Sequence, residues 1–484
     1  MREQPVSDGI NRRFDFAESL PRLLDVSAVH IIAIGGSGMS GIAALFASAG
    51  VTVTGSDRVA SASVARLRAA GASVTIGQDA RNVAALPVQT LVVVSTAIAE
   101  TNPELSAARA RGMRVLHRAQ ALAVLSRGRR AIAVAGANGK TTTSAMAVVA
   151  LRSAGVDPSF AIGSDIAGIG ANSGAGTGEQ FVVEADESDG SFVVYHPDVA
   201  VVTNIREDHL DFYGTQERLR AAYDGFADSI PTGGVLVACA DDEGSSALAR
   251  AHSQRLQVLT YGRTVGADLR LRDEHADGMT WSAQLDFPSG EALELKLAVP
   301  GAHNLLNAAG VAVAITAGCD ITPAAAVDGL AAFAGTSRRF ESRGVAGGVR
   351  VVDDYAHNPD KVEAVVRTGL ALRGDGRLIV LFQPHLYSRT LNFVEQFAAA
   401  LRLADVVFVM DVFAAREEPV PGVTGAVLSV RIPAAEYVPT AETAVQAVAA
   451  AARPGDLILT VGAGDVTSLG ARILARLSVE SPSS

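Results

Sequence analysis

A lysine in a glycine-rich turn is the first feature of this sequence that could do chemistry. The stretch AIAVAGANGKTTTSAMAVV, residues 131–149, reads as an apolar strand, a turn and the start of a helix. Only three of the 41 lysine and arginine residues of the chain are lysines, and Lys140 is one of them. Lysine carries a compact ammonium, whereas arginine carries a planar fork. The choice of lysine at this turn therefore indicates that a point charge is needed.

The turn predicts a site for a nucleotide triphosphate. Its pattern GxxGKT is shorter than the general GxxxxGK[ST] loop but has the same setting between strand and helix. Glycines let backbone N–H groups close around phosphate oxygens, and the helix N-terminus favours anions. We expect Lys140 to bridge the β- and γ-phosphates and the Thr141 hydroxyl to bind Mg²⁺. The alternative is a tight turn with an exposed lysine. The loop consists of Gly136, Ala137, Asn138, Gly139, Lys140, Thr141 and Thr142.

Polar residues follow the next two apolar strands. The stretch FVVEADESDGSF and the stretch VAVVTNIREDHL each pass from a buried-looking strand into acids. Carboxyl ends of parallel strands meet at one sheet edge, and oxygen ligands suit Mg²⁺. We predict a functional role for this group beside the glycine loop, although acids at a strand end are commonly just solvated. The candidates are Glu184, Asp186, Glu187, Asp189, Asn204, Asp208, His209 and Asp211.

A second glycine loop lies near the N-terminus. It matches GxGxxG, follows the strand-like VHIIAI and opens a helix-like stretch. Asp57 closes the next strand about 20 residues further on, where an acid commonly binds a ribose. The loop therefore predicts a second phosphate-bearing ligand with a ribose, in a separate domain. The residues concerned are Gly36, Ser37, Gly38, Met39, Ser40 and Asp57.

The composition limits the class of protein. Hydrophobic content of 49% and charged content of 19% are typical of a globular chain. A net charge of −10 argues against broad binding of nucleic acid. The two cysteines, Cys239 and Cys319, make neither a disulfide framework nor a zinc cluster, and we predict a cytoplasmic location. No apolar run of about 18 residues appears, so we predict no membrane insertion.

The elements that position these residues alternate between strand and helix. This pattern predicts an α/β protein, and a length of 484 residues predicts about three domains. We expect domain boundaries near two joints, LSRGRR and FAGTSRRFE, which give domains of residues 1–127, 128–333 and 334–484. Alternating polarity in residues 269–299 predicts antiparallel strands at the edge of the central sheet.

In their order along the chain, these motifs resemble the Mur ligases, the ATP-dependent amide-forming enzymes of peptidoglycan synthesis. The marks of the resemblance are IGGSGMSGIA, GANGKTTT, EADESDGSF, VTNIREDHLD, PGAHNLLNA, SRRFE, DDYAHNP, FQPHLYSRT, REEPVPGVTG and GAGD. The L-alanine-adding branch is the most similar. The resemblance implies a Rossmann-like N-terminal domain that binds a UDP-substrate. It implies a central P-loop ATPase-like domain with a mostly parallel sheet, and a Rossmann-like C-terminal domain that binds an amino acid.

The resemblance also implies roles for residues. Thr141, Glu184 and His209 would lie near the metals, and Lys140, Glu184, His209 and His357 would be catalytic. Asn304 and Asn307 would face the adenine of ATP, while Arg339 and Asp354 would reach its phosphates and ribose. The amino-acid pocket would contain Tyr355, His357, His385 and Arg389.

The implied reaction is ligation of L-alanine to the lactyl carboxylate of UDP-N-acetylmuramate through an acyl phosphate. The amine must lose a proton before or as it attacks, and the base is open among His209, His357 and His385. We predict ATP and Mg²⁺ as cofactors, and a monomer or weak homodimer.

Four positions bear on the branch of the family. Asn138 and Asn358 stand where that branch commonly has histidine, and Leu386 stands where some members have arginine. Tyr223 stands where the later-acting ligases carry a modified lysine, which favours the L-alanine-adding branch. The alternatives are a recycling ligase that adds a tripeptide, an NAD-dependent oxidoreductase, and a non-catalytic nucleotide-binding protein.

Overall fold

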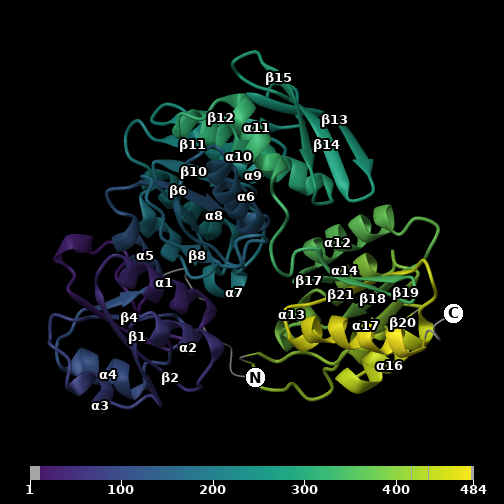
Figure 1. The fold of residues 1–484 in the computed structure, drawn as a ribbon, viewed down its shortest axis with the longest axis horizontal. Coiled ribbons are helices and arrows are strands. Elements are labelled where there is room, and N and C mark those ends of the chain that lie inside the picture. The colour runs from purple at the N-terminus through teal and green to yellow at the C-terminus, as the bar shows by residue number, and fades with distance from the viewer. Residues whose placement is uncertain (1–10, 416, 434, 481–484) are drawn as a thin grey trace. The chain divides into compact units, whose positions relative to one another are not determined.

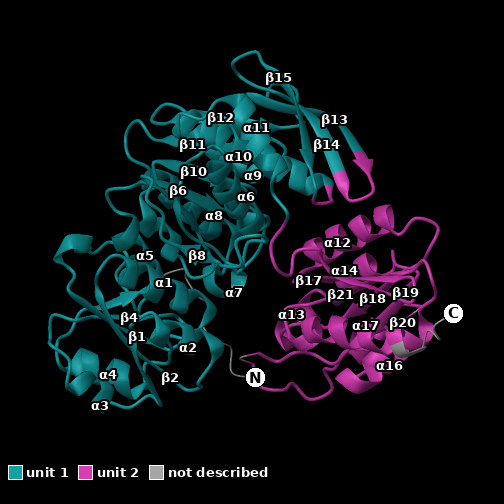
Figure 2. Cartoon of the chain, viewed as in Figure 1, with its two compact units in different colours: residues 1–275, 281–298, 302–334 teal, residues 276–280, 299–301, 335–484 magenta. Residues whose placement is uncertain are grey.

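The computed structural model describes residues 11–415, 417–433 and 435–480. The chain forms two compact units (Figure 2). Unit 1 comprises residues up to 275 together with 281–298 and 302–334, and unit 2 comprises 276–280, 299–301 and 335–484. Three sheets, each flanked by helices, are found in the described residues (Figure 1). The predicted α/β class with three domains is confirmed, and unit 1 contains two of the sheets.

The N-terminal sheet has five parallel strands in the order β3-β2-β1-β4-β5. This is the strand order of dinucleotide-binding folds, with a switch point between β1 and β4. Buried valines and isoleucines fill β1 and β4, which suits central strands covered on both faces. The prediction of a Rossmann-like domain is therefore confirmed. The elements are β1 (Ala28–Ile32), α1 (Ser37–Ser48), β2 (Thr52–Asp57), α2 (Ala62–Ala69), β3 (Ser73–Ile76), α3 (Arg81–Ala84), β4 (Leu91–Val94), α4 (Pro103–Ala110), β5 (Val115–His117) and α5 (Arg118–Ser126).

The central sheet has ten strands in the order β15-β14-β13-β12-β11-β10-β6-β9-β7-β8. Its middle is parallel, and the pairs β7–β8 and β14–β15 are antiparallel. The antiparallel edge predicted in residues 269–299 is thus present. The strands are β6 (Arg130–Ala135), β7 (Ser159–Ala161), β8 (Ser173–Gly174), β9 (Gln180–Glu184), β10 (Val199–Val202), β11 (Val235–Cys239), β12 (Gln257–Gly262), β13 (Leu269–Asp277), β14 (Thr280–Asp286) and β15 (Ala292–Leu297). The helices are α6 (Lys140–Ser153), η2 (Ser191–Tyr195), α7 (Leu210–Tyr213), α8 (Gln216–Asp228), α9 (Glu243–His252), α10 (Ala302–Gly318) and α11 (Pro323–Ala331).

The C-terminal sheet, in unit 2, has six strands in the order β16-β17-β21-β18-β19-β20. The β16–β17 hairpin is antiparallel, and the other pairs are parallel. The strands are β16 (Glu341–Ala346), β17 (Val349–Asp354), β18 (Leu378–Phe382), β19 (Val406–Val409), β20 (Ala435–Tyr437) and β21 (Leu457–Val461). The helices are α12 (Pro359–Leu372), α13 (Tyr387–Asn392), α14 (Val394–Leu401), α15 (Ala426–Ser429), α16 (Ala441–Ala451) and α17 (Leu469–Glu480).

One apolar core joins the N-terminal and central domains within unit 1. It includes Ala119 and Leu125 of α5 together with Phe192 and Tyr195 of η2. Because interiors are close-packed, this shared core fixes the start of α5 against the central domain. Among the helices in the described ranges, none is both long enough and apolar enough to cross a bilayer.

Candidate active site

The central glycine loop has a backbone that other residues could not adopt. Gly136 has φ +135°, and a Cβ built on it would lie 2.0 Å from Thr203 Oγ1. Gly139, directly before α6, has φ +89°, and its Cβ would lie 2.7 Å from Asn307 Oδ1. Positive φ at such values is accessible almost only to glycine. Both glycines are therefore required by the turn and by the close approach of neighbouring side chains.

The loop is held in place by the residues that follow β10. Thr203 Oγ1 donates to the carbonyl oxygen of Asn138 at 2.6 Å, and Asn204 Nδ2 donates to the same oxygen at 3.0 Å. In return, the backbone N–H of Asn138 donates to Asn204 Oδ1 at 3.0 Å. The sequence grouped Asn204 with candidate metal ligands, but its amide is engaged with the loop instead. Its contribution is to pre-form the phosphate site.

Lys140 begins α6 and points back into the loop. Its Nζ donates to the carbonyl oxygen of Gly136 at 2.6 Å and to both carboxylate oxygens of Glu187, at 2.7 and 3.0 Å. Burial lowers the pKa of Lys140, but the carboxylates of Glu187, Asp186 and Glu184 more than offset this, so that the net change is upward. The lysine is therefore held as an ammonium. From the sequence we expected this charge to lie at the phosphates of a nucleotide, and in the structure it contacts Glu187 beside the loop.

Glu187 is the buried partner of that ammonium, with 1% of its side chain exposed. Burial raises the pKa of Glu187, and Lys140 only partly offsets the effect. Tyr213 Oη donates to the carbonyl oxygen of Glu187 at 2.5 Å, which fixes the backbone at this position. From sequence, Glu187 is one of several candidate acids and has no individual role.

A pair of oxygens suited to a hard cation lies beside the loop. Thr141 Oγ1 donates to Glu184 Oε1 at 3.0 Å, and Glu184 Oε2 accepts from the N–H of Gly163 at 2.7 Å. Groups of three or more His, Cys, Asp or Glu side chains placed to hold a metal are absent from the described residues. Mg²⁺ commonly binds through one or two protein oxygens and completes its shell with phosphate and water. The Thr141–Glu184 pair fits such a site.

His209 lies close to the same acids. Its Nε2 is 3.9 Å from Glu187 Oε1 and 3.9 Å from Asp208 Oδ1. Its backbone has φ +56°, a conformation that non-glycine residues seldom adopt, directly before α7. The structure thus brings His209 to the acid cluster predicted from sequence, and the local fold holds it there at some conformational cost.

The acid cluster also contacts the N-terminal domain. Arg118, the first residue of α5, donates from Nη2 to Asp186 Oδ2 at 2.8 Å. His117 Nε2 lies 3.3 Å from Asp189 Oδ2. Burial raises the pKa of Asp186, but the positive charges of Arg118 and Lys140 outweigh it and hold the pKa well below its ordinary value. Asp186 is therefore a carboxylate that ties the two domains together.

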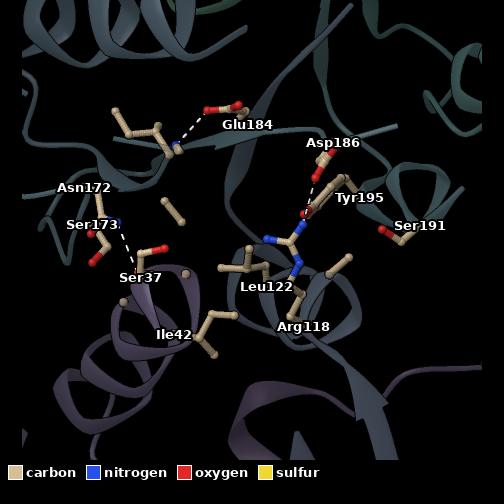
Figure 3. A pocket seen from close by; sticks show the side chains of 16 residues that line it. Ser37, Ile42, Arg118, Leu122, Asn172, Ser173, Glu184, Asp186, Ser191 and Tyr195 are labelled. Carbon is tan, nitrogen blue, oxygen red and sulfur yellow. Dashed lines mark hydrogen bonds and ion pairs between the residues drawn. The ribbon is translucent and has the colours of Figure 1, made fainter. Parts of the chain in front are cut away.

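A cavity of about 160 Å³ lies at this junction (Figure 3). One wall is the start of α1, with Ser37 and Gly38, and the opposite wall carries Glu184 and Asp186. Asn172 Nδ2 donates to the carbonyl oxygen of Ser37 at 3.2 Å and closes one side. The cavity therefore extends from the N-terminal glycine loop to Glu184, which accepts a hydrogen bond from Thr141 of the central loop.

The N-terminal loop residues divide into exposed and buried ones. Gly36, Ser37 and Gly38 are exposed at the start of α1, where unpaired N–H groups favour an anion. Met39 is only 5% exposed and packs in the core, so its side chain is unavailable to a ligand. The backbone N–H is then the group through which Met39 could contact a ligand, and its role in binding the UDP-substrate stays a prediction. Ser40 Oγ donates to the carbonyl oxygen of Ser37 at 3.3 Å.

Asp57 braces this loop and also lines a second cavity. Its Oδ2 accepts from the N–H of Gly35 at 2.8 Å. The cavity, of about 470 Å³, includes Arg58, Gln78 and Asn102 and lies beyond β2 and β4. Carboxyl ends of strands at a switch point commonly bind nucleosides. From the sequence we expected Asp57 to bind a ribose, and the cavity that Asp57 lines lies at this edge of the sheet.

Asn304 and Asn307 lie on the first two turns of α10, and both side chains are 7% exposed. Asn307 lies against Gly139, at the phosphate loop itself. The resemblance placed both at the adenine of ATP. The observed contact shows that Asn307 belongs to the immediate surroundings of the loop.

The remaining predicted residues form a cluster of their own in unit 2. The rings of Tyr355 and His357 have centroids 5.0 Å apart, and those of His357 and His385 are 5.7 Å apart. The guanidinium of Arg339 lies 5.4 Å from the Tyr355 ring centroid, and that of Arg338 lies 4.6 Å from it. Arg338 was not singled out from sequence. The structure therefore collects a cationic and imidazole-rich cluster at the ends of β17 and β18.

Two further predicted residues belong to this cluster. Asp354 accepts from the N–H groups of Phe340 and Ala356, each at 2.8 Å, and so braces the segment that carries Arg339. Burial raises the pKa of Asp354, and Arg339 opposes this change. Arg389 lies on α13 and is one of the charges that act on His357.

His357 is held as a neutral imidazole. Burial is the main cause that lowers its pKa well below the ordinary value, and the charges of Lys361 and Arg389 act in the same direction. Its Nδ1 lies 2.9 Å from the carbonyl oxygen of Tyr355, which can only accept, so Nδ1 carries the proton. Nε2 is then the acceptor, which is the state that a general base requires.

Three of the positions that bear on the branch of the family are capping or buried residues in the structure. Asn358 caps α12, because its Oδ1 accepts from the N–H of Lys361 at 2.9 Å. Leu386 precedes α13 with φ +68° and is 8% exposed. Tyr223 is 1% exposed and packs edge-on against Phe192, so a modified lysine has no counterpart there.

Arg118 is the residue at the cavity that sequence reasoning missed. It follows β5 directly, and carboxyl ends of strands in such sheets are where ligands bind. That position was the available signal. A single arginine in a helix of a chain with many arginines did not stand out.

Three family models match consecutive parts of the chain. They are described as the Mur ligase family catalytic domain, residues 28–130, the Mur ligase middle domain, residues 134–315, and the Mur ligase glutamate ligase domain, residues 338–464.

Individual proteins are similar over nearly the whole length. The UDP-N-acetylmuramate–L-alanine ligase of Kineococcus radiotolerans is 50% identical over 457 residues, which cover 93% of this chain and 96% of that protein. The crystal structure of UDP-N-acetylmuramate–alanine ligase from Thermotoga maritima has a TM-score of 0.78 at 28% identity and covers 94% of this chain and 100% of that chain. A murein peptide ligase from Psychrobacter arcticus, at 24% identity, has a TM-score of 0.69 and covers 93% of this chain and 99% of that chain.

Proposed function

This chain belongs to the Mur ligase family, and we propose that it joins L-alanine to the lactyl carboxylate of UDP-N-acetylmuramate, with ATP as the energy source. The product would be a precursor of peptidoglycan. The relative at 50% identity bears the name of this activity and is matched over 96% of its length. The resemblance drawn from the motifs is thereby confirmed at the level of the family.

The observation that carries the proposal is the cavity between the N-terminal glycine loop and Glu184. It runs from the start of α1 to Glu184, whose carboxylate accepts from Thr141 of the phosphate loop. A substrate held by its diphosphate at α1 could therefore extend its carboxylate toward a triphosphate on the central loop. Proximity of this kind is the main contribution that an enzyme makes to a phosphoryl transfer.

The first step would form an acyl phosphate. An oxygen of the lactyl carboxylate attacks the γ-phosphorus of ATP, a new C–O–P linkage forms, and the bond to the bridging oxygen of ADP breaks. Lys140 would exchange its contact with Glu187 for the phosphate oxygens and offset their charge. A magnesium ion at the Thr141–Glu184 pair, when bound, would neutralise further charge on the triphosphate.

The second step would form the amide. The amine of L-alanine attacks the acyl carbon, the tetrahedral intermediate expels phosphate, and the amine gives up a proton. His357 is a candidate to accept that proton, because its Nδ1 donates to the Tyr355 carbonyl and its Nε2 is left as an acceptor. Arg339, Asp354 and the rest of the unit 2 cluster are proposed to serve ATP and the amino acid.

Transfer of an isotope tests this mechanism. We expect UDP-N-acetylmuramate labelled with ¹⁸O in its lactyl carboxylate to yield inorganic phosphate that carries one ¹⁸O per amide formed. The label moves because the carboxylate oxygen that bonds to phosphorus leaves with it. Phosphate can be analysed by mass spectrometry or by its ³¹P isotope shift. Label in AMP, or unlabelled phosphate at full turnover, would rule out an acyl phosphate.

A tripeptide-adding ligase is the nearest alternative. The murein peptide ligase shares the fold, but at 24% identity that likeness supports the fold alone. The higher identity to L-alanine ligases favours L-alanine as the acceptor. We also propose a cytoplasmic location, because ATP and free amino acids are available there. A monomer or weak homodimer stays a prediction.

A further inference from the structure

We propose that Arg118 is the receptor for the lactyl carboxylate of the substrate, a role that the N-terminal domain would supply to the reaction centre. This inference rests on the proposed function, because it names the group that holds the reacting end of UDP-N-acetylmuramate.

The guanidinium lies in the wall of the cavity between the two domains. Its Nη2 donates to Asp186, and its Nη1 lies 3.5 Å from the position that a Cβ on Gly38 would occupy. About a third of the Arg118 side chain is exposed, and Figure 3 shows its other terminal nitrogen turned away from Asp186 into the cavity. The shared core holds α5 in place, and the hydrogen bond to Asp186 orients the guanidinium.

Most of the hydrogen-bonding capacity of Arg118 is unused. A guanidinium has five N–H donors, and within the described residues only the bond from Nη2 to Asp186 is present. Nε and Nη1 are therefore open to a ligand. A charged N–H donor forms a strong hydrogen bond with a carboxylate oxygen, so Nη1 can hold one oxygen of a carboxylate that enters the cavity. Asp186 neutralises part of the charge and sets the plane of the guanidinium.

The charges of the cavity require such a receptor. Its lining includes two carboxylates, Glu184 and Asp186, and Arg118 is the one positively charged side chain among the described residues that line it. Lys140 is close by but is engaged with Glu187. A substrate carboxylate entering this space would meet like charges, and Arg118 is placed to offset them.

The position also suits the chemistry. Asp186 is two residues beyond Glu184, and Glu184 contacts Thr141 of the phosphate loop. A carboxylate bound to Arg118 would thus lie at the strand end where the triphosphate and its metal are proposed to bind. Arg118 would hold one carboxylate oxygen and leave the other to attack phosphorus.

The diphosphate of the substrate is the other anion that Arg118 could bind, since Gly38 at the start of α1 is adjacent. Two ligands separate the cases. UDP-N-acetylmuramate carries both a diphosphate and a lactyl carboxylate, whereas UDP-N-acetylglucosamine carries the diphosphate without the lactyl group. Calorimetry would measure the dissociation constants of both for the wild-type protein and for Arg118→Met, without ATP.

We expect Arg118→Met to raise the dissociation constant of UDP-N-acetylmuramate roughly 10- to 100-fold, which is typical for loss of a charge-assisted hydrogen-bonded pair. The affinity for UDP-N-acetylglucosamine should change by less than about threefold. Arg118→Lys, which keeps the charge but loses the fork, should recover part of the lost affinity. Equal losses for both ligands would assign Arg118 to the diphosphate and overturn the inference, and so would no loss for either.

Two controls keep this result interpretable. Arg127→Met removes an arginine from the other end of α5, whose Nη1 donates to the carbonyl oxygen of Leu20 outside the cavity, and should leave both affinities unchanged. ADP binding to Arg118→Met should match the wild type, which shows that the central domain is folded.

If the wild-type protein makes no amide, the proposed function is wrong and the inference about Arg118 is wrong as well. If the wild type is active and Arg118→Met does not distinguish the ligands, only the inference fails.

Discussion

Replacing Lys140 with alanine should lower the turnover number by roughly 10³-fold and leave the dissociation constant of UDP-N-acetylmuramate within about twofold of the wild type. Loss of one pre-positioned charge partner at a reacting centre commonly costs 10²–10³ in rate. The ammonium also belongs to the central loop, whereas the UDP-substrate is proposed to bind at α1. Steady-state kinetics and calorimetry check the two halves of this expectation. Loss of both activity and substrate binding would mean that the two sites are not separate.

The structure adds a second expected effect of the same substitution. Lys140 and Glu187 form a buried ion pair, and removal of one partner leaves a buried carboxylate without its counter-ion. Breaking such a pair typically costs about 3–5 kcal/mol, and protonation of Glu187 would reduce that figure. Lys140→Ala should therefore be less stable to urea than the wild type. The double variant Lys140→Ala, Glu187→Gln should recover most of the lost stability and none of the lost turnover. If the double variant recovered activity, Lys140 would be serving the fold alone.

Gly136→Ala should abolish ATP binding and lower the free energy of unfolding by several kcal/mol. The residue has φ +135°, and its new Cβ would lie 2.0 Å from Thr203 Oγ1, an atom that itself donates to the loop at Asn138. Strain at such a backbone conformation costs on the order of 1–3 kcal/mol before any clash is counted. The loop must therefore open or Thr203 must move. Either change displaces the backbone N–H groups of the loop that are expected to bind the phosphates of ATP. Titration with ADP measures nucleotide binding, and denaturation in urea measures the free energy of unfolding.

Gly155→Ala is the matched control for this substitution. Gly155 lies just beyond the other end of α6 with φ +80°, and a Cβ there would meet nothing within 4 Å. The free energy of unfolding of this variant should fall by about 1 kcal/mol because of backbone strain, and its affinity for ADP should be unchanged. Equal loss of ADP binding in both variants would show that the effect of Gly136→Ala is general destabilisation rather than damage to the phosphate loop.

The features that could be predicted from the sequence are those that local chemistry determines. Glycines at 136 and 139, a lysine and a threonine in order specify a phosphate loop, because backbone conformation and helix start depend on neighbouring residues. The alternation of strand and helix likewise predicted three α/β domains and the antiparallel edge of the central sheet. The acids after β9 could be placed near the loop because parallel strands end at one edge.

The features that escaped prediction depend on packing between distant segments. In the sequence, Glu187 is one of four neighbouring acids, and only the fold shows that its carboxylate pairs with Lys140. Arg118 acquires its place only because the shared core sets α5 against η2. From sequence, Asn204 was a candidate metal ligand, whereas in the structure its side chain hydrogen-bonds to the backbone of Asn138 in the central loop. Met39 was predicted as part of the N-terminal loop, and its side chain packs in the core. None of these outcomes follows from spacing along the chain.

Release of phosphate from ATP, with Mg²⁺ and UDP-N-acetylmuramate present and L-alanine added or withheld, is the first measurement to make on this protein. We expect release to require both substrates and to yield one phosphate for each amide formed. If L-alanine fails and the tripeptide L-Ala-γ-D-Glu-diaminopimelate supports release, the acceptor proposed here is wrong and the recycling activity is right. Failure of both acceptors, with binding of a nicotinamide cofactor instead, would contradict the roles proposed for both glycine loops.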